Sequence, residues 1–256
     1  MKILAIGDVV GNIGIEYLQK NLWRVRNENK IDFCVANGEN ASEIFGLCRE
    51  DAIRILDSGA DVITLGNHAW GRRDICDFLD QSESVIRPAN YPIGVPGNGY
   101  TILRVSGYRV LCINLIGTVE MESQNSPFLE ADKILNAEQG RYDVAIIDFH
   151  AESTSEKIAM GKYLDGRVSL IFGTHTHVQT ADEQILPNGT AYITDVGMSG
   201  PVNGVIGVEY EAVLKILIMH MPEKHVVAKG EVKVHGVIAD IDETTGKARK
   251  IERIVF

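Results

Sequence analysis

The sequence predicts an α/β fold in which helices lie outside two packed β-sheets. Short apolar runs alternate with amphipathic stretches along most of the chain, which is the pattern of strand–helix–strand units. A hairpin pattern interrupts this alternation, and strand-like runs then dominate the end of the chain. This mixture favours two sheets over one open sheet. Because the 256 residues contain no repeat, low-complexity segment or long linker, we expect one domain over 1–256.

Each element has a local signature. The apolar run "KILAIG" at 2–7 predicts a buried strand, and 14–28 predicts a helix because its apolar residues fall on one face. The Ser106-Gly107 turn within 100–117 predicts an antiparallel hairpin. The other elements expected in this part of the chain are strands at 32–36, 61–66, 143–150 and 168–173, and helices at 50–59, 72–81, 127–138 and 155–166. Beyond them, we expect mostly β-structure, with strand-like runs at 190–197, 211–220, 229–242 and 250–256.

Charge and cysteine content narrow the class of protein. The chain has 25 basic and 35 acidic residues, and this net charge of −10 argues against a protein that grips long nucleic acid. A small anionic substrate remains compatible, because bound metal ions can supply local positive charge. The four cysteines lack C-x-x-C spacing, and Cys34 and Cys112 lie in apolar runs, which predicts buried reduced thiols. Since no run is long enough for a signal segment or a membrane span, we expect a cytoplasmic protein with no membrane partner.

Polar side chains follow the apolar runs, at the points where the predicted strands end. Because the carboxyl ends of parallel strands share one sheet edge, five separate segments should meet there. Mixed oxygen and nitrogen ligands suit Fe, Mn or Zn better than Mg or Ca, and a two-metal centre holds a phosphate well. The residues concerned are Asp8, Glu39, Asn40, Asn67, His68, His150, His175 and His177.

Each of these residues also has an ordinary structural interpretation. Asp8 could cap the following helix, Glu39-Asn40 could form a polar turn, and His150 could bond to backbone at a strand end. The metal interpretation is favoured because all five groups fall at the ends of β runs. By contrast, the later histidines lie beside no acidic or amide cluster, so we expect structural or surface roles for them (His220, His225 and His235). The glycine-rich segment at 7–14 lacks the spacing of nucleotide-binding loops.

The order and spacing of these motifs resemble the calcineurin-like metallophosphoesterase superfamily, from residue 2 to about residue 200. The matching segments are Gly7-Asp8, Gly38-Glu39, Gly66-Asn67-His68, His150 and Gly173-Thr174-His175-Thr176-His177. Two departures stand out, because Val9-Val10 replaces the usual x-His after the first aspartate and Glu39 replaces the usual bridging aspartate. These departures, with "NGENAS" and "RPANYP", resemble the bacterial YmdB-type phosphodiesterases. The resemblance implies a four-layer α/β/β/α sandwich, a di-iron or related centre, and activity on 2′,3′-cyclic nucleotides.

The resemblance also suggests which site residues hold each metal ion and which one acts as the general acid. We expect Asp8, Glu39, Asn40 and His177 to hold one metal ion, and Glu39, Asn67, His150 and His175 to hold the other. Asn40 would take the place of the absent histidine. Glu39 would bridge the ions together with a hydroxide that attacks phosphorus, and His68 would protonate the departing ribose oxygen. Iron is the first choice of metal, with Mn or Zn as alternatives.

The expected activity is hydrolysis of 2′,3′-cyclic AMP and GMP to monophosphates. Two alternatives remain, which are a phosphomonoesterase or nucleotidase on the same centre and a non-catalytic nucleotide-sensing regulator. Whether the protein forms a homo-oligomer is left open. Phe45, Trp70 and Tyr91 follow motif loops and could stack on a base. We expect Thr174 and Thr176 to orient histidines. Arg72 and Arg73 are interpreted as a solvated helix start rather than phosphate ligands.

Overall fold

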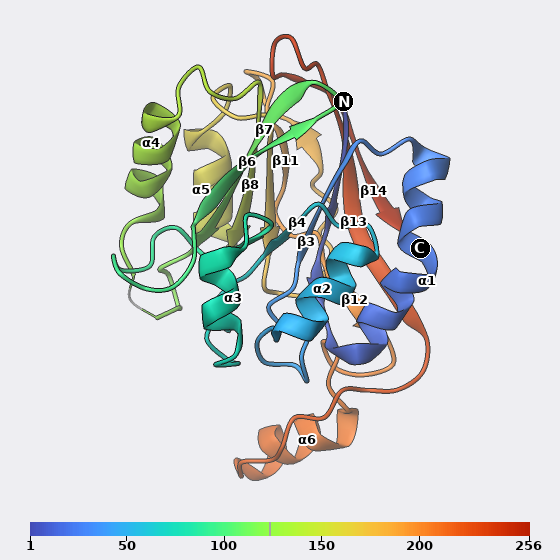
Figure 1. Cartoon of the computed structure of the whole chain (residues 1–256). Coiled ribbons are helices and arrows are strands. Elements are labelled where there is room, and N and C mark those ends of the chain that lie inside the picture. The colour runs from blue at the N-terminus through green and yellow to red at the C-terminus, as the bar shows by residue number, and fades with distance from the viewer. Residues whose placement is uncertain (123) are drawn as a thin grey trace.

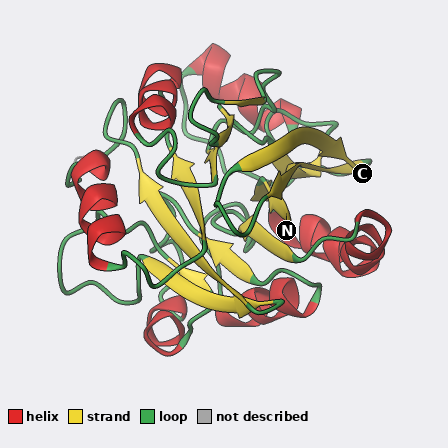
Figure 2. Cartoon of the chain, turned by 90° about the horizontal axis from the view of Figure 1, so that it is seen from above, coloured by secondary structure: helices red, strands yellow, loops and turns green. Residues whose placement is uncertain are grey.

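Two β-sheets pack face to face, and helices cover both outer faces (Figures 1 and 2). The computed structural model describes residues 1–122 and 124–256. The predicted α/β/β/α sandwich is therefore confirmed. Within the described residues, no helix is both apolar enough and long enough to cross a bilayer.

The first sheet contains the N-terminal strand near its centre. β1 runs parallel to β3, and β3, β4 and β5 continue in parallel, whereas β13 pairs antiparallel with β1. These parallel strands all end at one edge of the sheet. In spatial order, the strands are β2 (Asp8–Val9), β12 (Met198–Pro201), β13 (Val232–Ile241), β1 (Lys2–Ile6), β3 (Phe33–Asn37), β4 (Val62–Thr64) and β5 (Val85–Ile86), with β14 (Ala248–Val255) also paired to β13.

The second sheet has a parallel centre flanked by antiparallel strands. β7, β8, β9 and β11 are parallel, and β6 and β7 form the predicted antiparallel hairpin. Its turn residues Ser106 and Gly107 both have positive φ, 51° and 90°. In spatial order, the strands are β10 (Gln184–Ile185), β11 (Ala191–Ile193), β9 (Leu170–Thr174), β8 (Val144–His150), β7 (Tyr108–Ile116) and β6 (Tyr100–Val105).

Strand alternation divides the core into three apolar layers. Along β1, Ile3 and Ala5 point between the sheets, whereas Leu4 and Ile6 point outward beneath helices. The helices on the first sheet are α1 (Gly11–Asn29), α2 (Arg49–Asp57) and α3 (Ile75–Gln81). Those on the second sheet are α4 (Pro127–Ala137) and α5 (Thr154–Tyr163). The predicted face of α1 is buried as expected, through Ile15, Leu18, Leu22 and Val25.

The strand prediction for 211–220 is wrong, because this segment forms the helix α6 (Tyr210–Met219). Figure 1 shows α6 projecting away from both sheets, on the side where β1 ends. A projecting segment has no strand beside it, so it satisfies its backbone hydrogen bonds internally as a helix. Leu217 and Ile218 are 65% and 69% exposed, so the apolar run that suggested a strand is largely unburied.

The helix α6 belongs to an excursion that leaves the first sheet after β12 and returns before β13. We call residues 203–229 the cap segment. Its two ends are joined by backbone hydrogen bonds, with Glu209 N donating to Val226 O at 2.9 Å and Ala228 N donating to Gly207 O at 2.9 Å. These bonds close the base of the cap segment.

Candidate metal centre

The eight predicted site residues lie around one cluster at the carboxyl ends of the parallel strands. Each is delivered by the end of a strand, or by the loop that follows it, in both sheets. β1 leads to Asp8, and β3 leads to Glu39 and Asn40. β4 leads to Asn67 and His68, and β8 ends at His150. β9 leads to His175 and His177.

Glycine precedes several of these residues because the strand ends approach closely. A Cβ on Gly66 would clash with Glu39 Oε2 and with the His150 ring. At Gly7 it would clash with the Gly197 carbonyl, and at Gly173 with that of Thr194. Glycine is therefore required at these positions by packing.

Two fully buried carboxylates form the centre of the cluster. Asp8 Oδ2 accepts a hydrogen bond from the His175 backbone at 3.1 Å, but Asp8 Oδ1 has no hydrogen-bond partner among the described residues. Glu39 Oε2 accepts from the His68 backbone at 3.0 Å, and Glu39 Oε1 lies 3.2 Å from His150 Nε2. A buried carboxylate oxygen without a partner is unfavourable, and a cation would satisfy it.

The three histidines of the cluster are oriented by groups outside it. In each ring, one nitrogen has a partner outside the cluster and the other nitrogen faces the cluster. The outward contacts are His150 Nδ1 to Thr174 Oγ1 at 2.9 Å, His175 Nε2 to Glu152 Oε2 at 3.0 Å and His177 Nδ1 to Ile206 O at 3.0 Å. Ligand atoms of Glu39, His150 and His175 all lie within 4.8 Å of one another, a spacing that could hold a metal ion.

Two amides complete the cluster. Asn67 Oδ1 lies 2.9 Å from His150 Nε2. Asn40 is 3% exposed and bridges two histidines, with Nδ2 3.1 Å from His177 Nε2 and Oδ1 2.8 Å from His68 Nδ1. Asn40 therefore belongs to the same network as the carboxylates and is more than a residue of a surface turn.

His68 occupies a different position from the other histidines. Its side chain is 29% exposed and lines a cavity above the cluster. Its Nδ1 contacts Asn40 Oδ1, and lies 3.4 Å from Glu39 Oε1. The ring is thus held on its inner side and open to the cavity.

Charge in the cluster is little screened by solvent. Burial raises the pKa of Asp8. Burial also opposes ionisation of Glu39, but His150 and His68 hold the pKa of Glu39 well below its usual range. Burial by itself would lower the pKa of His150, yet the carboxylates of Glu39, Asp8 and Asp148 raise it to about 9. These carboxylates therefore favour the protonated form of His150, and a bound ion would compete with that proton.

Asp148 supports the cluster from beneath and was missed by the sequence analysis. It is fully buried in β8, where Oδ1 accepts from Thr174 Oγ1 at 2.8 Å and Oδ2 from Asn37 Nδ2 at 3.1 Å. Because the Thr174 hydroxyl donates to Asp148, it accepts the proton on His150 Nδ1 and leaves His150 Nε2 free for a metal. Thr174 thus orients a histidine, as expected. A charged residue inside the apolar run "VAIIDFH" was the available signal.

A buried ion pair holds the turn between the last two histidines. Lys157 Nζ lies 2.7 Å from Asp195 Oδ2, and both side chains are nearly inaccessible to solvent. Asp195 Oδ2 also accepts from Thr176 N at 3.1 Å and Thr176 Oγ1 at 2.7 Å. Thr176 therefore orients the turn through Asp195 rather than by contacting a histidine. This anchorage matters because His175 and His177 both have positive φ, 100° and 65°.

The cavity above the cluster has a volume of about 170 Å³. Its floor is formed by site residues from three strand ends, those of β3, β4 and β9, and its wall is mainly apolar. The wall residues are Ile44, Phe45, Ile206, Val208 and His225. His225 was expected to be structural or on the surface, and nothing in its local sequence connects it with this site. A larger hollow of about 660 Å³, beyond loop 41–43, contains none of the eight residues, so size alone does not mark the site.

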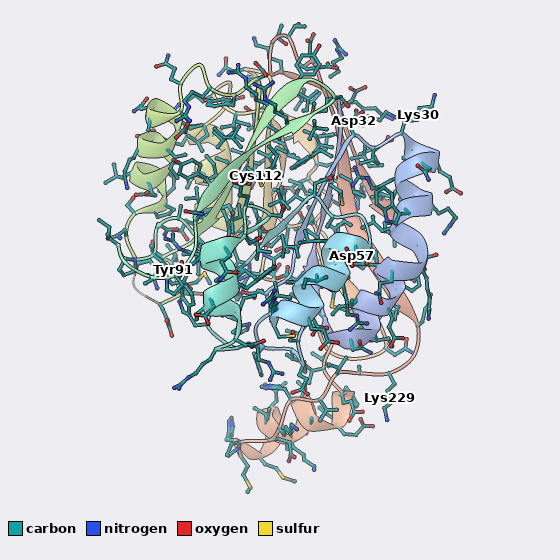
Figure 3. All side chains as sticks on the ribbon, viewed as in Figure 1. Lys30, Asp32, Asp57, Tyr91, Cys112 and Lys229 are labelled. Carbon is teal, nitrogen blue, oxygen red and sulfur yellow. The ribbon has the colours of Figure 1, made fainter. Side chains whose placement is uncertain are left out.

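Other side chains considered from the sequence have packing roles. Trp70 and Tyr91 contact each other with ring centroids 5.6 Å apart, and the Tyr91 hydroxyl donates to Gly66 O at 3.2 Å. Tyr91 lies beside α3 (Figure 3), and neither ring lines the cavity. Arg72 donates to Glu43 Oε2 at 2.8 Å, so its charge is already paired.

This fold and this arrangement of buried carboxylates, amides and imidazoles are those of a protein of the metallophosphoesterase type. A family model described as "YmdB-like protein" matches residues 4–254, and the chain belongs to that family. It is 46% identical over 256 residues to the 2′,3′-cyclic-nucleotide 2′-phosphodiesterase of Bacillus subtilis strain 168, covering 100% of this chain and 97% of that protein.

Two solved structures have closely similar folds. A hypothetical protein from Thermus thermophilus superposes with a TM-score of 0.94 at 38% identity, over 100% of this chain and 99% of that one. A phosphatase from Mycoplasma pneumoniae, described as novel, also gives 0.94, at 32% identity over 100% of this chain and 93% of that one.

Proposed function

We propose that this chain is a metal-dependent phosphodiesterase that hydrolyses 2′,3′-cyclic nucleotides, such as cyclic AMP and GMP, to nucleoside monophosphates. One observation carries the proposal: two buried carboxylates, two amides and three inward-facing histidine nitrogens meet beneath a cavity that His68 lines. The name of the Bacillus subtilis relative supports the choice of substrate.

The donor set fits two metal ions. Asp8 Oδ1 has no hydrogen-bond partner among the described residues, and the inward ring nitrogens contact one another and the two amides around the same centre. We assign Asp8, Glu39, Asn40 and His177 to one ion, and Glu39, Asn67, His150 and His175 to the other. Carboxylate, amide and imidazole donors suit Fe, Mn or Zn, and iron is the first choice. When bound, the ions supply Lewis acidity to the phosphate and to an attacking water.

His68 is the proposed general acid. Asn40 and Glu39 hold its Nδ1 side, so the rest of the ring faces the cavity. An imidazole in this position can donate a proton to a departing ribose oxygen. Removing His68 should lower kcat by ~10²–10⁴-fold while the metal content stays the same.

The cavity favours a diester over a monoester. Within the described residues, its lining contains no lysine or arginine. A monoester dianion carries one more negative charge than a diester, and it would lack a further cation to balance that charge. A phosphomonoesterase therefore remains the weaker alternative.

The proposal is tested by elemental analysis of protein purified without added metal, together with a substrate panel. We expect about two ions per chain, and 2′,3′-cyclic nucleotides should turn over faster than 3′,5′-cyclic nucleotides or monoesters. Full activity with one ion per chain would exclude the two-metal assignment. Preference for monoesters would exclude the diesterase, and full metal load without turnover would favour a non-catalytic regulator.

Two variants separate the roles of the histidines. His150→Ala should lose both metal and activity, whereas His68→Ala should lose activity alone. His220→Ala is the matched control, because His220 is exposed at the end of α6 and should change neither. Loss of metal in His68→Ala would show that His68 is a ligand.

A further inference from the structure

The cavity above the cluster is too small to enclose a nucleotide. Its volume of about 170 Å³ is below the ~300–1,000 Å³ of most small-molecule pockets. A second hollow of about 420 Å³ shares Phe45 and His225 with it. A ligand whose phosphate lies at the cluster would therefore extend past these two side chains.

Phe45 stands between the candidate acid and the second hollow. Its ring centroid lies 4.8 Å from that of His68 and 5.5 Å from that of His225, in edge-to-face contacts of 81° and 73°. Phe45 is nevertheless 41% exposed. An aromatic ring left open beside a polar site can gain stability by stacking on a ligand.

The cap segment fixes this wall relative to the cluster. The Ile206 carbonyl lies 3.0 Å from His177 Nδ1, which links the wall to a proposed metal ligand. His225 is adjacent to Val226, whose carbonyl accepts from Glu209 N at the base of the cap segment. The cap segment thus carries both His225 and the carbonyl that contacts His177.

We infer that Phe45 and His225 form the nucleobase subsite, in which the base stacks on Phe45 and extends into the second hollow. The inference rests on the proposed function and specifies how that site recognises its substrate. In the second hollow, Arg72 is already paired with Glu43. Because stacking accepts any base, adenine and guanine substrates should differ little, and a base-free cyclic diester should be a poor substrate.

The experiment compares 2′,3′-cyclic AMP with ethylene phosphate, a five-membered cyclic diester that has no base. In Phe45→Ala and His225→Ala, the ratio of kcat/KM for 2′,3′-cyclic AMP to that for ethylene phosphate should fall roughly 5- to 100-fold, mainly through KM. Phe45→Leu keeps an apolar side chain without an aromatic face, and it should show the same fall. It replaces Phe45→Ala if that variant does not fold. Metal content is measured for each variant.

Two control variants match the substitutions. Tyr163→Ala removes an aromatic ring of similar exposure, 44%, from α5. His220→Ala removes a second exposed histidine of the cap segment. Both should leave the ratio unchanged, because neither residue lines either hollow.

Binding of adenosine, which has no phosphate, provides a readout independent of catalysis. Calorimetry should detect adenosine binding to the wild type and its loss in Phe45→Leu. Unchanged kcat/KM ratios in both Phe45→Leu and His225→Ala would overturn the subsite while the phosphodiesterase stands. If the wild type cleaves neither diester but loses adenosine binding in Phe45→Leu, the proposed function fails and the subsite stands.

Discussion

The ion pair between Lys157 and Asp195 allows a quantitative test of how the histidine turn is held. Both side chains are almost fully buried, at 2% and 1% exposure, and their charged atoms are 2.7 Å apart. Lys157→Met removes one charge and leaves the other in the interior, which typically costs about 3–5 kcal/mol. Asp195 would keep three hydrogen bonds, from Thr176 N, Thr176 Oγ1 and Gly197 N. We therefore expect the lower end, about 3 kcal/mol.

Urea denaturation of the metal-free protein measures this change, because metal binding would otherwise contribute to the stability. Lys162→Met is the control, since Lys162 is exposed on the same helix, and it should change the free energy of unfolding by less than about 0.5 kcal/mol. Adding Asp195→Asn to Lys157→Met should recover part of the loss, because no charge is then left buried. A loss below about 1 kcal/mol for Lys157→Met would refute the reasoning.

Three further predictions concern packing, thiols and pH. Gly66→Ala should abolish loading with two metal ions, because its methyl group would enter the space of a buried carboxylate and imidazole; normal metal content would contradict this. Burial raises the pKa of the Cys34 and Cys112 thiols, so Ellman's reagent should titrate at most two of the four cysteines before unfolding. Hydrogen bonds from Arg109 lower the pKa of Asp143 from 3.8 to about 2, so the pair stabilises the fold above about pH 4 and loses this effect as the pH falls toward 2. Asp143→Asn should therefore lower the urea midpoint at neutral pH, and its difference from the wild type should shrink near pH 3, whereas a difference independent of pH would exclude this origin.

Much of the sandwich could be predicted from local patterns. Buried strands such as "KILAIG" and amphipathic helices such as α1 differ in period, and their alternation predicted helices outside two packed sheets. The four-layer order was implied by the resemblance to a known superfamily. Local pattern also placed the site residues at the ends of predicted strands. Their meeting further requires that the two sheets pack face to face, because β8 and β9 belong to one sheet and β1, β3 and β4 to the other.

The remaining features depend on contacts that are distant in the sequence. The apolar run of α6 predicts a strand, because the sequence alone does not show that this segment projects away from both sheets. His225 joins the site only because the cap segment folds back against Phe45, which is far from it in the chain. Lys157 and Asp195 lie on different elements, and neither residue alone indicates that they form a pair.

The position of β1 between β3 and β13 has a consequence for biosynthesis. A chain emerging from the ribosome displays Asp8 early, but His175, whose backbone contacts Asp8, follows 167 residues later. The strand β13, which flanks β1 on its other side, is synthesised after all eight site residues. On the proposed assignment, a growing chain lacks part of the ligand set until His177 has been synthesised. We therefore expect metal binding to begin late in synthesis, when the strands that carry these residues can pack together.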